Sequence, residues 1–120
     1  MPSHARTIVV AFDGSDASHR ALDAAADLMA YGSTLNVVHV RGAASEGRTV
    51  DLAREHLLRR RVMARYLEPC GHAAKEVVEA AREVDADLVV VGRRNALEGV
   101  LGPISSEIVR HAPCDVLVVR

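Results

Sequence analysis

The chain has 120 residues, enough for one domain with a single hydrophobic core. Hydrophobic residues make up 49% of the chain and charged residues 26%, a balance typical of a folded globular protein. The formal net charge of -1 and the aromatic content of 2% argue against the broad basic surface and the stacking platform of a nucleic-acid-binding protein. We therefore expect one domain spanning residues 1–120 and no nucleic-acid partner.

The sequence has no recognisable targeting, membrane or metal-binding segment. Residues 1–6 lack the apolar core of a signal peptide, and no apolar stretch approaches the roughly 20 residues that a membrane helix requires. The two cysteines, Cys70 and Cys114, have neither disulfide-framework nor CxxC spacing, and the six histidines include no HxxxH pair. These observations predict a cytoplasmic protein with no membrane contact and no metal site.

Strand and helix patterns alternate in the first half of the chain. Residues 7–12 form a continuous apolar run, typical of a strand that is covered on both faces. Apolar residues within 21–29 lie on one face of a helix, and residues 35–40 form a second strand that contains a histidine. Residues 50–57 carry a second helical stripe. Residues 62–67 form a weaker strand, interrupted by an arginine, which we expect at an edge of the sheet.

The second half repeats this order. Residues 74–84 carry a third helical stripe, and residues 87–92 form another continuous apolar run. A fourth helix is predicted over residues 104–112, because apolar positions recur there at helical spacing and Pro113 then stops the helix. Residues 115–120 form the last apolar run.

This alternation predicts a doubly wound α/β domain, with a parallel sheet and helices on both faces. Consecutive parallel strands need a connection long enough to hold a helix, and such crossovers are right-handed. Ligands bind these sheets beyond the carboxyl ends of the strands, where the winding reverses. The turns that follow Phe12 and Gly92 are therefore the places to look for a site.

The turn after the first strand contains Asp13 and Gly14. Gly14 allows a tight backbone turn, and the Asp13 carboxylate could accept hydrogen bonds from a ribose or an exocyclic amine. A turn residue or a helix cap is the alternative interpretation of Asp13.

The turn after the fourth strand is rich in glycine and runs into the last helix. Glycines before a helix expose backbone N–H groups to phosphate, aided by the positive end of the helix dipole, and Arg93 and Arg94 would add favourable charge. A surface loop with two solvated arginines is the alternative. The terminal Gly-Lys-Ser/Thr of a Walker loop is absent.

Together these segments resemble the universal stress protein family across nearly the entire chain. The stretches that carry the resemblance are residues 8–15, 21–22, 35–40, 86–92, 107–114 and 116–119. The resemblance implies a five-stranded sheet in the order 3-2-1-4-5 and a homodimer formed through the last strand, which ends at Arg120. Nucleotide-binding members have a pattern G-x2-G-x9-G-[ST] after the fourth strand, whose backbone and hydroxyl groups hold the phosphates of ATP.

This phosphate-binding pattern is partly present. Gly92 matches its first glycine and Gly102 its last, but Asn95 occupies the position of the second. Six residues separate Asn95 from Gly102 where the family has nine, so the segment that wraps the phosphates is three residues short. Pro103 replaces the serine or threonine, which removes a hydroxyl and a backbone N–H.

Other positions of the family's nucleotide site are retained. The resemblance assigns Asp13 to the nucleoside and Val40 to the adenine. It assigns Gly92, Gly102 and Ser105 to the phosphates.

Two functions are compatible with these residues. The first is a regulatory or stress-response protein with a degraded adenine-nucleotide site that binds ATP weakly or not at all. The second is a genuine ATP-binding stress-response switch, with magnesium if ATP binds, in which Arg93 or Arg94 replaces the lost contacts. No general base and nucleophile are linked by a recognisable spacing, so no enzymatic activity is expected.

Overall fold

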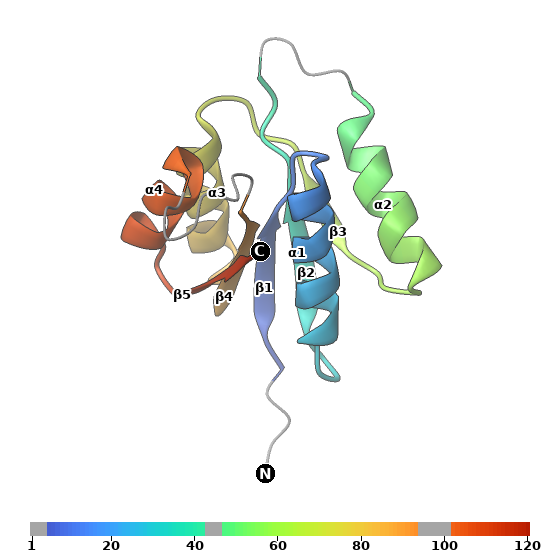
Figure 1. The fold of residues 1–120 in the computed structure, drawn as a ribbon. Coiled ribbons are helices and arrows are strands. Elements are labelled where there is room, and N and C mark those ends of the chain that lie inside the picture. The colour runs from blue at the N-terminus through green and yellow to red at the C-terminus, as the bar shows by residue number, and fades with distance from the viewer. Residues whose placement is uncertain (1–4, 43–46, 94–101) are drawn as a thin grey trace.

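The computed structural model describes residues 5–42, 47–93 and 102–120, and a five-stranded parallel sheet lies at the centre of this part of the chain (Figure 1). Its strand order is β3-β2-β1-β4-β5. The strands are β1 (Thr7–Ala11), β2 (Thr34–Val38), β3 (Arg65–Leu67), β4 (Leu88–Gly92) and β5 (Asp115–Val119). In register, Ile8 of β1 lies opposite Leu35 of β2 and Leu88 of β4. The predicted fold class and strand order are confirmed.

Among the described residues, two helices cover each face of the sheet. They are α1 (Asp16–Asp27), α2 (Thr49–Arg59), α3 (Ala73–Glu83) and α4 (Pro103–His111). α1 and α2 pack on one face, and α3 and α4 pack on the other (Figure 1). The result is a three-layer sandwich with a hydrophobic core on each side of the sheet.

Both faces of the central strands are buried, which explains their continuous apolar runs. Ile8, Val9 and Val10 of β1 are fully buried. Ile8 and Val10 face α1 and α2, whereas Val9 faces α3 and α4, since successive side chains of a strand point to opposite faces. Each such side chain contributes about 1.5–3 kcal/mol relative to an exposed one. These strands therefore anchor the sheet edge on which the candidate site is built.

The weak strand pattern at residues 62–67 corresponds to the short edge strand β3. β3 begins later than predicted because the residues before it complete the end of α2. The N–H groups of Arg61 and Val62 donate to the carbonyls of Leu58 and Leu57 at 3.0 and 2.9 Å. These bonds satisfy carbonyls that the helix end would leave without partners.

Arg61 and Asp85 adopt the left-handed backbone conformation just after α2 and α3, with φ of 58° and 54°. The α3 end repeats the hydrogen bonds of the α2 end, with Ala86 N–H donating to the Ala81 carbonyl at 2.9 Å. Glycine is the residue most often found at this position, because it has no Cβ to clash with the backbone. Neither helix has glycine at this position, and the left-handed conformation is less favourable for Arg61 than for Asp85.

Three positions of the predicted helical stripes are exposed in the structure, and Ile104, 40% exposed, is one of them. α1 ends at Asp27, so Leu28 lies in the helix cap and is 37% exposed. Val109 of α4 is 47% exposed, whereas Ile108 is fully buried. α4 packs against α3 and β5 at one side of the sheet, so only its inner face reaches the core.

A charged contact ties α2 to α1. His56 Nε2 and Arg60 Nη1 lie 2.8 and 3.0 Å from Oδ1 of Asp23. Partial burial acts to raise the pKa of Asp23, but its hydrogen bonds and charge interactions with His56 and Arg60 together hold the pKa below its ordinary value.

Candidate functional site

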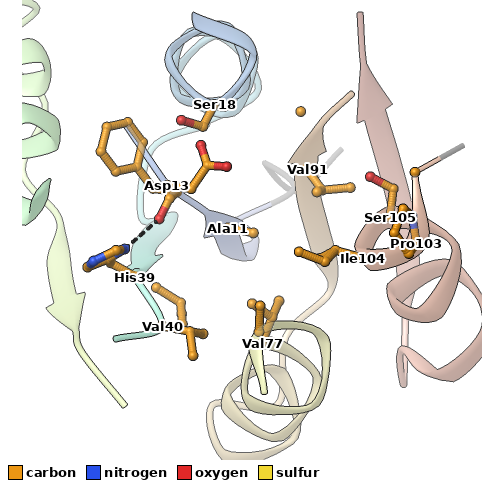
Figure 2. Close-up of a pocket in the computed structure, with 15 residues that line it drawn as sticks. Ala11, Asp13, Ser18, His39, Val40, Val77, Val91, Pro103, Ile104 and Ser105 are labelled. Atoms are coloured by element: carbon orange, nitrogen blue, oxygen red, sulfur yellow. Dashed lines mark hydrogen bonds between the residues drawn. The ribbon is translucent and has the colours of Figure 1, made fainter. Parts of the chain in front are cut away.

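A pocket of about 520 Å³ lies beyond the carboxyl ends of β1, β2 and β4 (Figure 2). The strand order reverses between β1 and β4, which is where doubly wound sheets bind ligands. The structure brings all five predicted positions to this pocket: Asp13, Val40, Gly92, Gly102 and Ser105. Their role in nucleotide binding stays a prediction.

The turn after β1 is built by Asp13, Gly14 and Ser15. Asp13 Oδ1 accepts a hydrogen bond from the Ser15 N–H at 2.9 Å, and Gly14 has a φ of +87° that favours glycine. Ser15 caps α1, since its Oγ accepts the Ser18 N–H at 3.1 Å. Asp13 is thus a turn residue as well as an exposed carboxylate at the rim of the pocket.

Gly92, at the end of β4, lies against the first turn of α1. A Cβ at this position would be 2.4 Å from the Ala17 carbonyl oxygen and 2.9 Å from the Ser18 backbone nitrogen. Backbone atoms cannot move aside as a side chain does, so packing alone requires glycine here. The sequence pattern suggested a phosphate-binding glycine, and the structure adds this independent reason for it.

α4 begins at the opposite side of the pocket. Gly102 is its N-cap and provides no capping side chain, and Pro103 occupies the first turn, one residue before the predicted start of the helix. A Cβ on Gly102 would meet no atom within 4 Å, so packing does not require glycine there. Ser105, two residues after Pro103 in the same turn, is 5% exposed and lines the pocket.

His39 was predicted as part of the second strand, but β2 ends at Val38 and His39 joins the pocket wall. Its Nδ1 lies 3.0 Å from the Phe12 carbonyl oxygen, the contact drawn as a dashed line in Figure 2. A carbonyl only accepts, so Nδ1 carries the proton. The ring thereby joins the carboxyl ends of β1 and β2. A histidine within an apolar run was the available signal for this role.

Apolar side chains from two helices complete the pocket. Val77 of α3 and Ile104 of α4 line it together with Ala11 and Val40 (Figure 2). Sequence reasoning assigned Val77 and Ile104 only to helical core stripes. It therefore missed their place in the site.

Of the two arginines predicted to replace lost phosphate contacts, Arg93 lies within the described residues. The Arg93 N–H donates to the Val119 carbonyl at 2.7 Å, which continues the pairing of β4 with β5. Arg93 is not among the residues that line the described pocket. Arg94, Asn95 and the shortened segment before Gly102 lie outside the described residues.

The described part of the chain holds no group of three or more His, Cys, Asp or Glu side chains that could bind a metal ion. Over the same residues, no helix has the length and apolar character needed to cross a bilayer.

The sequence matches the universal stress protein family over residues 4–69 and 70–120. A universal stress protein encoded in the QAH/OAS sulfhydrylase 3' region of Thermus aquaticus is 34% identical over 135 aligned residues, covering 96% of this chain and 98% of that protein.

Solved structures show the same fold. A universal stress protein in complex with cAMP is 28% identical and has a TM-score of 0.81, with 96% of each chain covered. A universal stress protein family protein from Arabidopsis thaliana, with AMP bound, has a TM-score of 0.75 at 16% identity, covering 95% of this chain and 90% of that one. With the family match extending over nearly all of the sequence, the chain belongs to the universal stress protein family.

Proposed function

We propose that this chain is a regulatory or stress-response protein whose pocket binds an adenine nucleotide mainly through its nucleoside half and binds ATP only weakly. One observation carries the proposal: the residues predicted to contact the nucleoside, Asp13 and Val40, line the pocket, whereas the helix start predicted to contact the phosphates has a proline in its first turn.

The nucleoside side offers shape and polarity that suit adenosine. Ala11, Val40, Val77 and Ile104 present apolar surface to a flat base, and Asp13 places a carboxylate at the rim where ribose hydroxyls can donate to it. A volume of about 520 Å³ lies within the range of small-molecule sites. The structural relative with cAMP in its complex supports a ligand of this class.

The phosphate side offers fewer donors than a helix start usually does. Pro103 has neither N–H nor hydroxyl, and Gly102 has no side chain, which leaves the following N–H groups and the Ser105 hydroxyl for an anion. In the described part of the wall, no lysine or arginine adds positive charge. Each additional phosphate of the ligand should therefore add little binding affinity. We assign the protein no catalytic activity.

A genuine ATP-binding switch is the second candidate, because all five family positions lie around one pocket. It requires compensating contacts, such as those predicted for Arg93 or Arg94, and magnesium with the triphosphate. Calorimetric titration with adenosine, AMP, cAMP and Mg-ATP separates the two. We expect saturable binding with dissociation constants within about tenfold of one another.

The Asp13→Ala variant should lose this binding, while Asp16→Ala, an exposed change in the next turn, should retain it. ATP bound more than about a hundredfold tighter than AMP supports the switch instead. Absence of binding by all four compounds at millimolar concentration rejects both.

The proposal includes a cytoplasmic homodimer, with neither nucleic acid nor membrane as a partner. β5 is an edge strand of the described sheet, and its Leu117 is 37% exposed. Pairing of two β5 strands would protect both edges. Light scattering on wild type and Leu117→Lys should show a dimer and a monomer, respectively. A monomeric wild type at high concentration contradicts this part.

A further inference from the structure

Positive charge is concentrated in one stretch of the chain. Residues 48–65 contain six arginines and two acidic residues, whereas the rest of the chain contains nine basic and fourteen acidic residues. This stretch forms α2, the turn that follows it and the first residue of β3. The chain as a whole is nearly neutral, so the asymmetry is invisible in the net charge of -1.

Five of the six arginines of this stretch fall into two groups, and the sixth, Arg48, is the exposed N-cap residue of α2. Arg54 contacts Asp51 at 3.1 Å and lies over the ring of Tyr66, at 4.6 Å from the centroid. Arg60 contacts both Asp23 and Asp27. These two guanidinium groups are used within the fold.

Arg59, Arg61 and Arg65 are different, because all three are exposed and have no ion-pair or hydrogen-bond partner for their guanidinium groups within the described residues. Two large apolar side chains are their neighbours in sequence: Leu58, directly before Arg59, is 55% exposed, and Met63, between Arg61 and Arg65, is 79% exposed. We call these five residues the arginine surface. It combines charge that nothing in the described fold neutralises with apolar area that nothing in the described fold covers.

Arg61 stands where the backbone favours glycine. Its φ of 58° places it in the left-handed region, which arginine seldom adopts. Asp85 holds the matching position after α3, but aspartate is one of the residues enriched in this conformation. A charged side chain kept at an unfavourable backbone position indicates a use for that side chain.

The arginine surface lies away from the two sites already described. In Figure 1 the turn between α2 and β3 is at the outer margin of the molecule, beside the β3 edge of the sheet, whereas α4 and β5 lie at the other edge. The pocket faces the carboxyl ends of β1, β2 and β4. A dimer formed through β5 would leave the arginine surface open in each subunit.

The structure points to this surface as a docking site for an acidic protein segment that also carries apolar side chains. Charge complementarity selects a negatively charged partner, and Leu58 and Met63 select one with apolar residues among its acids. Nucleic acid fits less well, because the surface has no aromatic side chain on which bases could stack. A membrane fits less well, because it has no aromatic anchor for the interface.

Fluorescence anisotropy with two labelled peptides of equal length tests this site. One peptide alternates glutamate and leucine, and the other alternates glutamate and serine. At about 50 mM salt the protein should bind the first peptide more tightly than the second, and binding should weaken as salt rises. Arg61→Gly should raise the dissociation constant several-fold, and the Arg61→Gly/Arg65→Ser pair at least about tenfold.

Arg61→Gly suits this test because glycine relieves the backbone at that position, so weaker binding cannot be attributed to unfolding. Arg110→Ser, on the exposed side of α4, is the matched control that removes equal charge elsewhere and should bind the peptide like wild type. The proposal is overturned if both peptides bind equally, or if Arg110→Ser loses as much affinity as Arg61→Gly. It is also overturned if phosphatidylserine vesicles, duplex DNA or a second copy of the chain bind the surface in preference to the glutamate-leucine peptide.

Discussion

Gly92 and Ala17 are far apart in the sequence, yet a Cβ on Gly92 would lie 2.4 Å from the Ala17 carbonyl oxygen. This contact joins the end of β4 to the first turn of α1, immediately beside the pocket. The glycine that the family pattern links with phosphate therefore also sets the distance between two walls of the site.

Replacing Gly92 with alanine should destabilise the fold by about 1–3 kcal/mol, because the added methyl group meets backbone rather than a side chain that can move. Urea denaturation measures this as a lower midpoint. Gly102→Ser is the matched control: its site is open, and a serine N-cap should raise stability by a few tenths of a kcal/mol. Equal losses in both variants would contradict this account.

Much of the fold could be predicted from the sequence because strand burial leaves a direct mark on it. β4 is buried at all five positions, so every residue had to be apolar or glycine, and the run was easy to recognise. β3 was the least certain strand, since an edge strand with an exposed Arg65 need not be apolar. Val109 shows the limit of helical periodicity, which cannot tell how much of a helix the sheet covers.

The site was less predictable. Asp13 and Ser105 could be placed by the family resemblance, but Val77 and Ile104 could not, because an apolar helix residue gives the same signal whether it faces the core or a pocket. The packing role of Gly92 depends on how closely α1 approaches β4. The sequence pattern of a single helix or strand does not predict the distance between two elements.

Arg61→Gly should raise the free energy of unfolding by about 0.5–1 kcal/mol, because glycine adopts the left-handed conformation without a Cβ clash. Asp85→Gly, at the matching position after α3, should gain less, since aspartate tolerates this conformation better. Urea denaturation measures both changes in the free energy of unfolding, as a shift of the midpoint with no change in the dependence of that free energy on urea concentration. If Arg61→Gly were destabilising, the arginine would be making a contact that favours the folded state.

His39→Leu should destabilise the protein by about 1–3 kcal/mol, because it removes the donor that lies 3.0 Å from the buried Phe12 carbonyl. It should also weaken nucleotide binding, since the carboxyl ends of β1 and β2 would no longer be joined at the pocket wall. Denaturation and calorimetric titration measure the two effects separately. Full stability with unchanged affinity would show that the ring contact is dispensable.

The Asp23–His56 contact should give part of the protein's stability a defined pH dependence. The folded pKa of Asp23 lies below its ordinary value of 3.8, so between the two values the folded protein binds fewer protons than the unfolded chain. The contribution is therefore complete above 3.8 and is lost as the pH falls through that value toward the folded pKa.

A double-mutant cycle tests this sign directly. The coupling between Asp23→Asn and His56→Gln should be favourable at about pH 5.5, and it should shrink as the pH falls below 3.8 and Asp23 begins to bind a proton in the folded state. The measured quantity is the free energy of unfolding of the four proteins at each pH. Because Asp23 also contacts Arg60, the single Asp23→Asn variant should lose more stability at the higher pH than His56→Gln does. A coupling that grows on acidification would mean that the contact raises the pKa of Asp23 rather than lowering it.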